Sequence, residues 1–131
     1  MLVKANLVLF ALLIAHTVDH AVNQPLRELP ATGTLVGVAG FVIVAASTVL
    51  ALRRSAIAAP AAIVSGLVTA FGLVVVHLAP RWSDPISDPY WEFDPNALSW
   101  ALAAAPLLAA LGLAAIAARK LRARPATVQA S

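Results

Sequence analysis

The stretch GTLVGVAGFVIVAASTVLAL, residues 33–52, contains no charged side chain and no proline. A helix rises about 1.5 Å per residue, so a run of this length covers about 30 Å, the thickness of the hydrocarbon core of a bilayer. A helix also satisfies its backbone hydrogen bonds internally, as a membrane segment must. This stretch therefore predicts that the chain folds in a membrane.

The composition agrees with a membrane protein. The chain has 131 residues, of which 61% are hydrophobic and only 11% are charged, whereas soluble domains carry about 25% charged residues. Cysteine is absent, which excludes disulfides, thiolate metal sites and cysteine nucleophiles. The net charge of +3 does not indicate nucleic-acid binding, because the basic residues lie at the ends of apolar runs. The high use of alanine, valine, proline and arginine is typical of a GC-rich bacterial genome.

Three more apolar runs have the length of a membrane span. We expect an all-α integral membrane protein, a four-transmembrane-helix bundle, with spans near residues 4–22, 33–52, 57–79 and 96–118. The first run is interpreted as a retained helix rather than a signal peptide, since no small-residue cleavage site follows it. The spans form a single domain over residues 1–122, and residues 123–131 are expected to be a short flexible cytoplasmic tail.

The charged residues predict the orientation. Most basic residues fall on one side of a four-span arrangement, namely Lys4, Arg53, Arg54, Arg119, Lys120, Arg122 and Arg124. Arg27 and Arg81 fall on the other side, and all six acidic residues lie on or near that side. By the positive-inside rule both termini are cytoplasmic (N-in/C-in). We expect a multi-pass protein of the cell inner (plasma) membrane, with the lipid bilayer as its surroundings.

Local sequence signals predict where the fourth helix starts, where it kinks, and how the second span packs. Asp94 is expected to be the N-cap of the fourth helix. Pro106 should kink that helix and leave the carbonyl of Leu102 without its helical donor. In the second span, small residues recur at Gly33, Gly37 and Gly40. We expect this glycine face to pack within the bundle, with dimerisation as a homo-oligomer as the alternative.

Ionisable residues gather at the outer end of the first span. His16, Asp19, His20 and Asn23 share one helical face, and His77 lies within a turn of the outer end of the third span. A carboxylate in a spanning helix costs about 2.5–3.5 kcal/mol at the centre, so we expect the cluster to face the bundle interior. There Asp19 would accept hydrogen bonds from a histidine or from Arg81.

Three functions are compatible with this cluster. We favour a pocket that binds a lipophilic small molecule or acts on it by acid–base chemistry, of the isomerisation, cyclisation or hydrolysis class. Whether it is an enzyme stays open. The expected catalytic residues are His16, Asp19, His20 and His77, and the expected substrate-binding residues are Asn23, Arg81, Asn96, Ser99, Trp100, Trp82, Tyr90 and Trp91.

The alternatives assign the cluster differently. In the first, the protein is a non-catalytic accessory subunit of a larger membrane complex, and the cluster only fixes helix register. In the second, His16, His20 and His77 bind a metal or haem b, because histidines at i and i+4 can present two imidazoles to one ion. No cofactor is assumed otherwise.

The outer loop, residues 80–95, is expected to be a lid over this cluster. It contains Asp-Pro three times, which favours extended turns capped by aspartates. Its aromatic residues should lie at the headgroup level. In the default interpretation the acidic side chains are solvated. The alternatives are that one or two of them reach the histidines, or that they gather Ca²⁺.

Overall fold

The computed structural model describes residues 1–23 and 31–123, without the side chains of residues 31–34. Arg27 and residues 124–131 of the expected tail lie outside the described residues. The elements in chain order are α1 (Leu2–Asn23), α2 (Ala31–Leu52), α3 (Ala58–Leu73), a π-helical turn η1 (Val74–Leu78), a 3₁₀ turn η2 (Tyr90–Glu92) and α4 (Ala97–Arg122).

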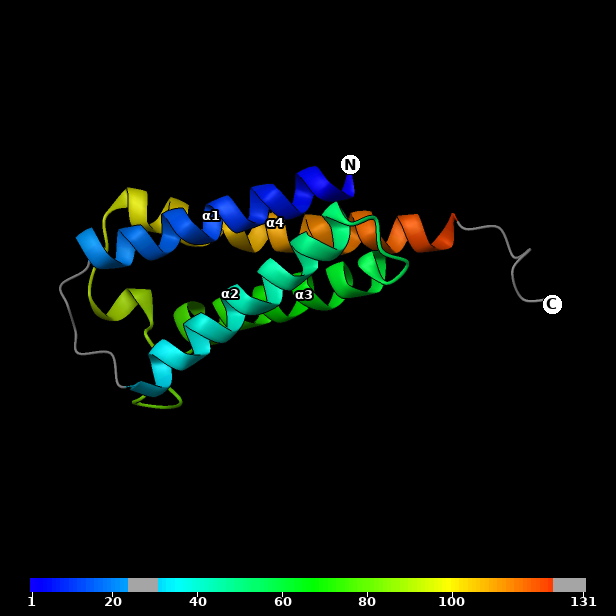
Figure 1. Cartoon of the computed structure of the whole chain (residues 1–131). Coiled ribbons are helices and arrows are strands. Elements are labelled where there is room, and N and C mark those ends of the chain that lie inside the picture. Colours follow the sequence, from blue (N-terminus) through cyan, green and yellow to red (C-terminus); the bar gives the residue numbers. More distant parts are fainter. Residues whose placement is uncertain (24–30, 124–131) are drawn as a thin grey trace, which may run out of the picture.

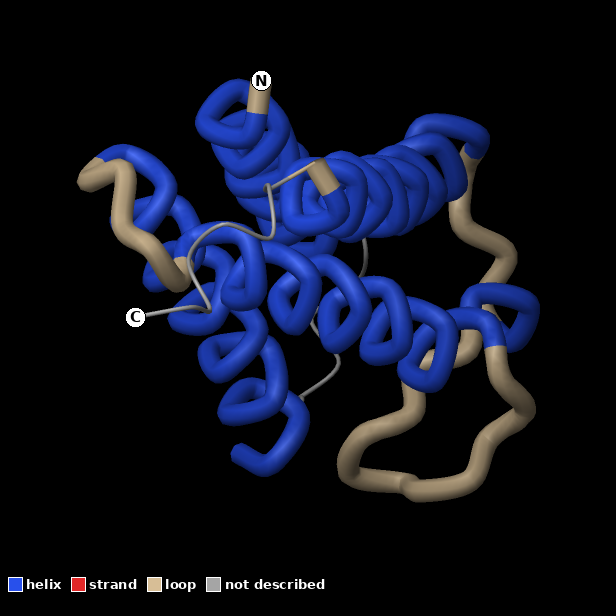
Figure 2. The backbone as a smooth tube through the Cα atoms, turned by 90° about the vertical axis from the view of Figure 1, so that its right-hand side faces the viewer, coloured by secondary structure: helices blue, strands red, loops and turns tan. Residues whose placement is uncertain are grey.

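The described part of the chain is all-helical, with loops between the helices and no strand (Figure 2). Four segments are long and apolar enough to cross a membrane, namely Leu2–Asn23, Leu35–Leu52, Ala58–Leu78 and Ala97–Arg122. This confirms the predicted all-α fold with four apolar helices of spanning length.

The helices run up and down along one bundle (Figure 1). The pairs α3–α4, α1–α4, α2–α3 and α1–α2 are all in contact, and the α3–α4 pair is the most extensive. We call the end that holds Leu2, the turn at 53–57 and Arg122 the terminal end. The opposite end, with Asn23, His77 and the loop at 79–96, is the loop end.

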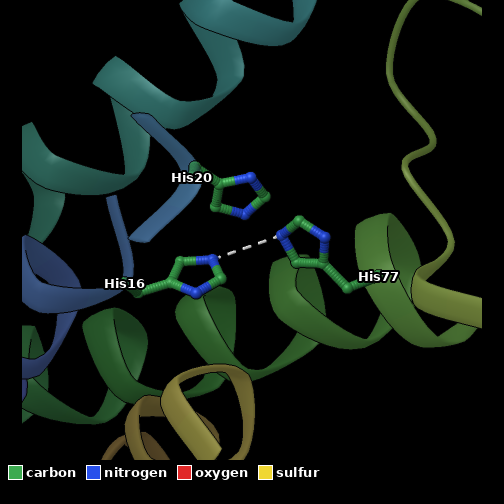
Figure 3. A group of neighbouring side chains, drawn as sticks. All are labelled: His16, His20 and His77. Carbon is green, nitrogen blue, oxygen red and sulfur yellow. Dashed lines mark hydrogen bonds between the residues drawn. The ribbon is translucent and has the colours of Figure 1, made fainter. Parts of the chain in front are cut away.

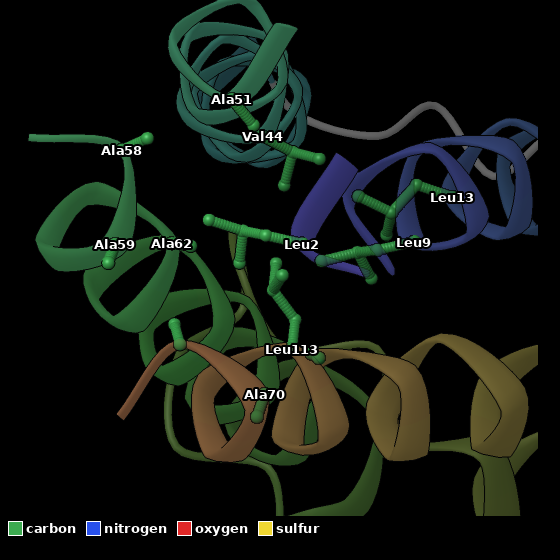
Figure 4. Packing of buried hydrophobic residues seen from close by; sticks show 12 residues of the cluster. Leu2, Leu9, Leu13, Val44, Ala51, Ala58, Ala59, Ala62, Ala70 and Leu113 are labelled. Atoms are coloured by element: carbon green, nitrogen blue, oxygen red, sulfur yellow. The ribbon is translucent and has the colours of Figure 1, made fainter. Parts of the chain in front are cut away.

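The apolar core fills the half of the bundle toward the terminal end (Figure 4). Leu9, Val44 and Leu113 are fully buried there, and the facing surfaces of α3 and α4 contribute mainly alanines. At Gly66 an added Cβ would lie 2.4 Å from the backbone oxygen of Ala110. The α3 and α4 backbones therefore touch, as membrane helices with small residues can.

The glycine face of α2 does not take part in this packing. An added Cβ at Gly37 or Gly40 would meet no heavy atom within 4 Å, so the expectation that these glycines pack inside the bundle is wrong. The reason is that the first turns of α2 diverge from the other helices (Figure 1), and residues 35–39 are exposed.

The start of α4 also differs from the prediction. Asn96, not Asp94, is the N-cap, and its side-chain oxygen accepts a hydrogen bond from the Ser99 amide at 2.9 Å. Asn caps a helix as well as Asp does, and here it stands directly before the helical run. Asp94 instead has a left-handed backbone with φ 48°.

Candidate functional site

The three histidines of the chain meet at the loop end of the bundle (Figure 3). His16 and His20 lie one turn apart on α1, and His77 comes from η1. The Nε2 atoms of His16 and His77 are 3.3 Å apart. One ring nitrogen from each of the three residues lies within 4.8 Å of the others. We call these three residues the histidine triad.

The triad is shielded from its surroundings. Only 6% of His16 and 7% of His77 is exposed, and His20 is partly covered. The three rings stack edge to face or at a tilt, with centroid separations of 4.6 to 5.1 Å. Polar rings packed this closely inside an apolar bundle need partners for their nitrogens.

The π-helical turn η1 carries His77 and also holds the outer loop. As the last turn of the helix, it leaves carbonyl oxygens without helical donors, and the loop donates to two of them. The indole Nε1 of Trp82 bonds Val75 O at 2.9 Å, and the amide of Asp88 bonds Val76 O at 2.8 Å. The loop thus folds back over the helix end, and residues 87–90 are buried. Short π-helical turns of this kind are frequent at functional sites.

Asp88 contacts two of the histidines. Its backbone oxygen lies 3.2 Å from Nδ1 of His77, and its carboxylate lies 4.0 Å from Nδ1 of His20. A carbonyl oxygen only accepts, so Nδ1 of His77 must carry the proton. Nε2 of a neutral His77 then presents a lone pair to His16.

His16 has a similar oxygen on its far side. Its Nδ1 has no hydrogen bond of normal geometry among the described residues, yet the Leu102 carbonyl is close enough to act on the ring. Pro106 lies inside α4 and has no N–H to give to that carbonyl. In His77 and His20, Nδ1 is thus directed toward oxygens of Asp88, and Nε2 faces His16 and the Tyr90 hydroxyl respectively.

Tyr90 joins the triad from the outer loop. It is fully buried, and its hydroxyl oxygen lies 3.3 Å from Nε2 of His20. Its ring contacts His77, Phe93 and Trp100, at centroid separations of 4.9, 5.4 and 5.3 Å respectively. Of the predicted substrate-binding residues, Tyr90 thus lies at the triad and Trp100 lies against Tyr90.

Asp19 lies beside the triad but is held by its own helix. It is 2% exposed and accepts a hydrogen bond from Nδ2 of Asn23 at 2.8 Å. Its charge also acts on His16 and His20. Asp19 and Asp88 thus place two carboxylates around the three rings.

Arg81 has its partners in the outer loop. It forms an ion pair with Glu92 and donates to Ser87 O at 3.3 Å, and its NH1 lies 4.0 Å from Asp84. The hydrogen bond to Glu92 raises the pKa of Arg81, so the guanidinium stays charged. Arg81 therefore fastens the outer loop.

The remaining predicted site residues lie at the start of α4 or on the surface of the outer loop. Asn96 and Ser99 form the α4 cap. Trp82 and Trp91 are about half exposed, at 54% and 50%, on the outside of the loop. The residue missing from the expected set is Asp88. Its Asp-Pro context indicated an extended turn, but nothing in the sequence distinguished it from the other loop carboxylates.

Comparisons with protein-family models, with curated proteins and with solved structures found no match for this chain.

Proposed function

We propose that the protein is a metal-binding membrane protein that holds one divalent transition-metal ion in the histidine triad. The observation that carries the proposal is the convergence of three imidazole nitrogens within 4.8 Å. Imidazole suits zinc, copper, nickel and iron. In known sites, ligating histidines usually donate their other N–H to a carbonyl or carboxylate. The Asp88 carbonyl stands in that position for His77 at 3.2 Å, and the Asp88 carboxylate lies 4.0 Å from Nδ1 of His20.

The spacing supports tetrahedral coordination. Ligands at about 2.0–2.1 Å from a tetrahedral zinc ion are about 3.3 Å from one another. The Nε2 atoms of His16 and His77 are 3.3 Å apart. The nitrogen of His20 stands farther off and has to move closer by rotation about its side-chain bonds.

The charges around the triad also support the binding of a divalent cation. With Nδ1 of His77 protonated and Nε2 of His16 nearby, two nitrogen atoms face each other and need either a shared proton or a cation between them. Two carboxylates, Asp19 and Asp88, act on the ring of His20. Together they would balance two positive charges in a region of low dielectric.

Haem fits the triad less well than a bare ion. Two axial imidazoles bind on opposite faces of a porphyrin, with their nitrogens about 4 Å apart and the macrocycle between them. His16 and His77 are closer than that, at 3.3 Å, and their rings meet edge to face.

We further propose that the four helices cross the plasma membrane with both termini in the cytoplasm. The support is that Lys4, Arg53, Arg54, Arg119, Lys120 and Arg122 belong to the terminal end, as the positive-inside rule requires. The triad would then lie at the extracytoplasmic side. Reporter fusions after Arg122 and within residues 82–86 test this, and a periplasm-active reporter after Arg122 would contradict it.

The metal proposal is tested on detergent-purified protein by elemental analysis and by Co²⁺ titration. We expect one ion per chain, and a Co²⁺ spectrum with the intense visible bands of a four-coordinate site. His77→Phe keeps an aromatic ring against Tyr90 and should remove binding. Thr48→Val, a buried change in the other half of the bundle, is the control and should leave binding intact.

Two results would contradict the proposal: wild-type protein that takes up none of zinc, cobalt, copper or iron, or a His77→Phe variant that binds as tightly as wild type. In either case acid–base chemistry on a lipophilic molecule becomes the better candidate. The observation in its favour is the chain of contacts from Asp88 through His77 to His16, which could pass a proton. The accessory-subunit alternative stays a prediction and requires a co-purifying partner.

A further inference from the structure

Tyr90 is the one tyrosine of the chain, and its position differs from that of the other loop aromatics. Trp82 and Trp91 are about half exposed, whereas Tyr90 is completely buried. Its ring is enclosed by His77, Phe93 and Trp100. This packing fixes the direction of the ring and holds the hydroxyl at the triad instead of at the membrane surface.

The Tyr90 hydroxyl adds a second short distance between possible metal ligands at the triad. His16 and His77 supply one pair of atoms 3.3 Å apart. His20 and Tyr90 supply a second pair, also 3.3 Å apart, that shares no atom with the first. Each of the two distances equals the edge of a tetrahedron of ligands around a zinc-sized ion, which is about 3.3 Å long. Rotation of the His20 side chain would bring the two pairs together as opposite edges.

We propose that Tyr90 is the fourth ligand of the metal and binds it through its phenolate oxygen, an inference that rests on the metal-binding function proposed above. When the ion binds, a bond forms between the phenol oxygen and the metal. The phenol O–H bond breaks, and its proton leaves to solvent. No electron is transferred. A bound cation lowers the pKa of a coordinating group, as it does for thiols and water.

Coordination by Tyr90 would couple the outer loop to the metal. The triad belongs to α1 and η1, but Tyr90 belongs to η2 within the loop at 79–96. A bound ion would therefore tie the loop to the bundle by a bond, in addition to the Trp82 and Asp88 hydrogen bonds. The loop would be closed over the site in the metal-loaded protein.

The test compares wild type, Tyr90→Phe and the control Trp91→Phe, with Cu²⁺ and Zn²⁺ as probes. For wild type and Trp91→Phe with Cu²⁺ we expect a visible phenolate-to-metal charge-transfer band. For Zn²⁺ at about pH 8, calorimetry in buffers of different ionisation enthalpy should show about one proton released per ion. Tyr90→Phe should keep the 1:1 stoichiometry, lose the band and the proton release, and bind at least about tenfold more weakly.

The outcomes separate the two proposals. If Tyr90→Phe matches wild type in spectrum, proton release and affinity, Tyr90 is not a ligand, while the histidine triad stands. If neither protein binds Cu²⁺ or Zn²⁺, the metal-binding function itself is wrong, and the role of Tyr90 falls with it. Thermal unfolding of the metal-free variants checks that Tyr90→Phe has not simply unfolded the loop.

Discussion

The bundle buries polar side chains in both halves, and the two groups are built differently. Toward the terminal end, Asn6 donates to Leu2 O at 3.0 Å and accepts from the Ser47 hydroxyl at 2.7 Å. The donors of Asn6 and Ser47 meet acceptors, and the pair joins α1 to α2. Toward the loop end, the Nε2 atoms of His16 and His77 face each other across 3.3 Å. The first group forms hydrogen bonds within the protein, whereas the second brings two imidazole nitrogens together, and we propose that it binds a metal ion.

The sharpest test of this difference truncates one residue in each group and compares metal binding with stability. His16→Ala should weaken Co²⁺ binding by at least about 100-fold, because one of three nitrogen ligands is lost. Asn6→Ala should leave Co²⁺ binding unchanged. It should lower the free energy of unfolding by about 1–3 kcal/mol, since the Ser47 hydroxyl loses its acceptor in a buried site. Titration and unfolding in detergent measure both, and equal effects on metal affinity would remove the distinction.

The packing of the apolar half can be disrupted at the contact between α3 and α4. Gly66→Ala places a Cβ 2.4 Å from Ala110 O, and because backbone must move, we expect a loss of about 1–3 kcal/mol in unfolding free energy. Gly112→Ala, where an added Cβ meets nothing within 4 Å, is the matched control and should be neutral. A neutral Gly66→Ala would show that the helices are not packed this closely.

We expect the loop end to depend on Asp88 more than on the exposed loop acid Asp84. Asp88→Asn keeps the backbone contact to His77 but removes the carboxylate near His20, so we expect about tenfold weaker Co²⁺ binding. The side chain of Asp84 is 93% exposed, and Asp84→Asn should change Co²⁺ affinity by less than about twofold. Equal effects would assign the carboxylates a general electrostatic role instead.

The smallest effect is expected at the surface of the loop. Glu92→Gln weakens the ion pair with Arg81, and partly exposed pairs contribute only about 0.2–1 kcal/mol. Unfolding should therefore change little, and Co²⁺ affinity should stay within about twofold. A large loss of metal binding in this variant would mean that the Arg81 pair positions the loop and, with it, Tyr90.

The sequence predicted the helices better than the site. Hydropathy and length identified the four apolar segments, because a bilayer requires long uncharged helices. The i, i+4 spacing of His16 and His20 and the level of His77 indicated which rings share a region. The burial of Tyr90, the contacts of Asp88 and the α4 cap at Asn96 could not be predicted from the sequence. These features depend on how the irregular backbone of the outer loop folds back.

The π-helical winding of η1 has a consequence for how the site tolerates change in chain length. A π-turn accommodates an extra residue, and one residue corresponds to about 100° of rotation in an α-helix. Deleting a single valine from Val74–Val76 would let α3 continue as a regular helix, with hydropathy and length almost unaltered. His77 would then leave the helix axis at a different angle, because a π-turn rotates less per residue than an α-turn. An apolar segment that looks interchangeable with any other is thus sensitive to register at one position, and we expect such a deletion to weaken Co²⁺ binding without disturbing helix content.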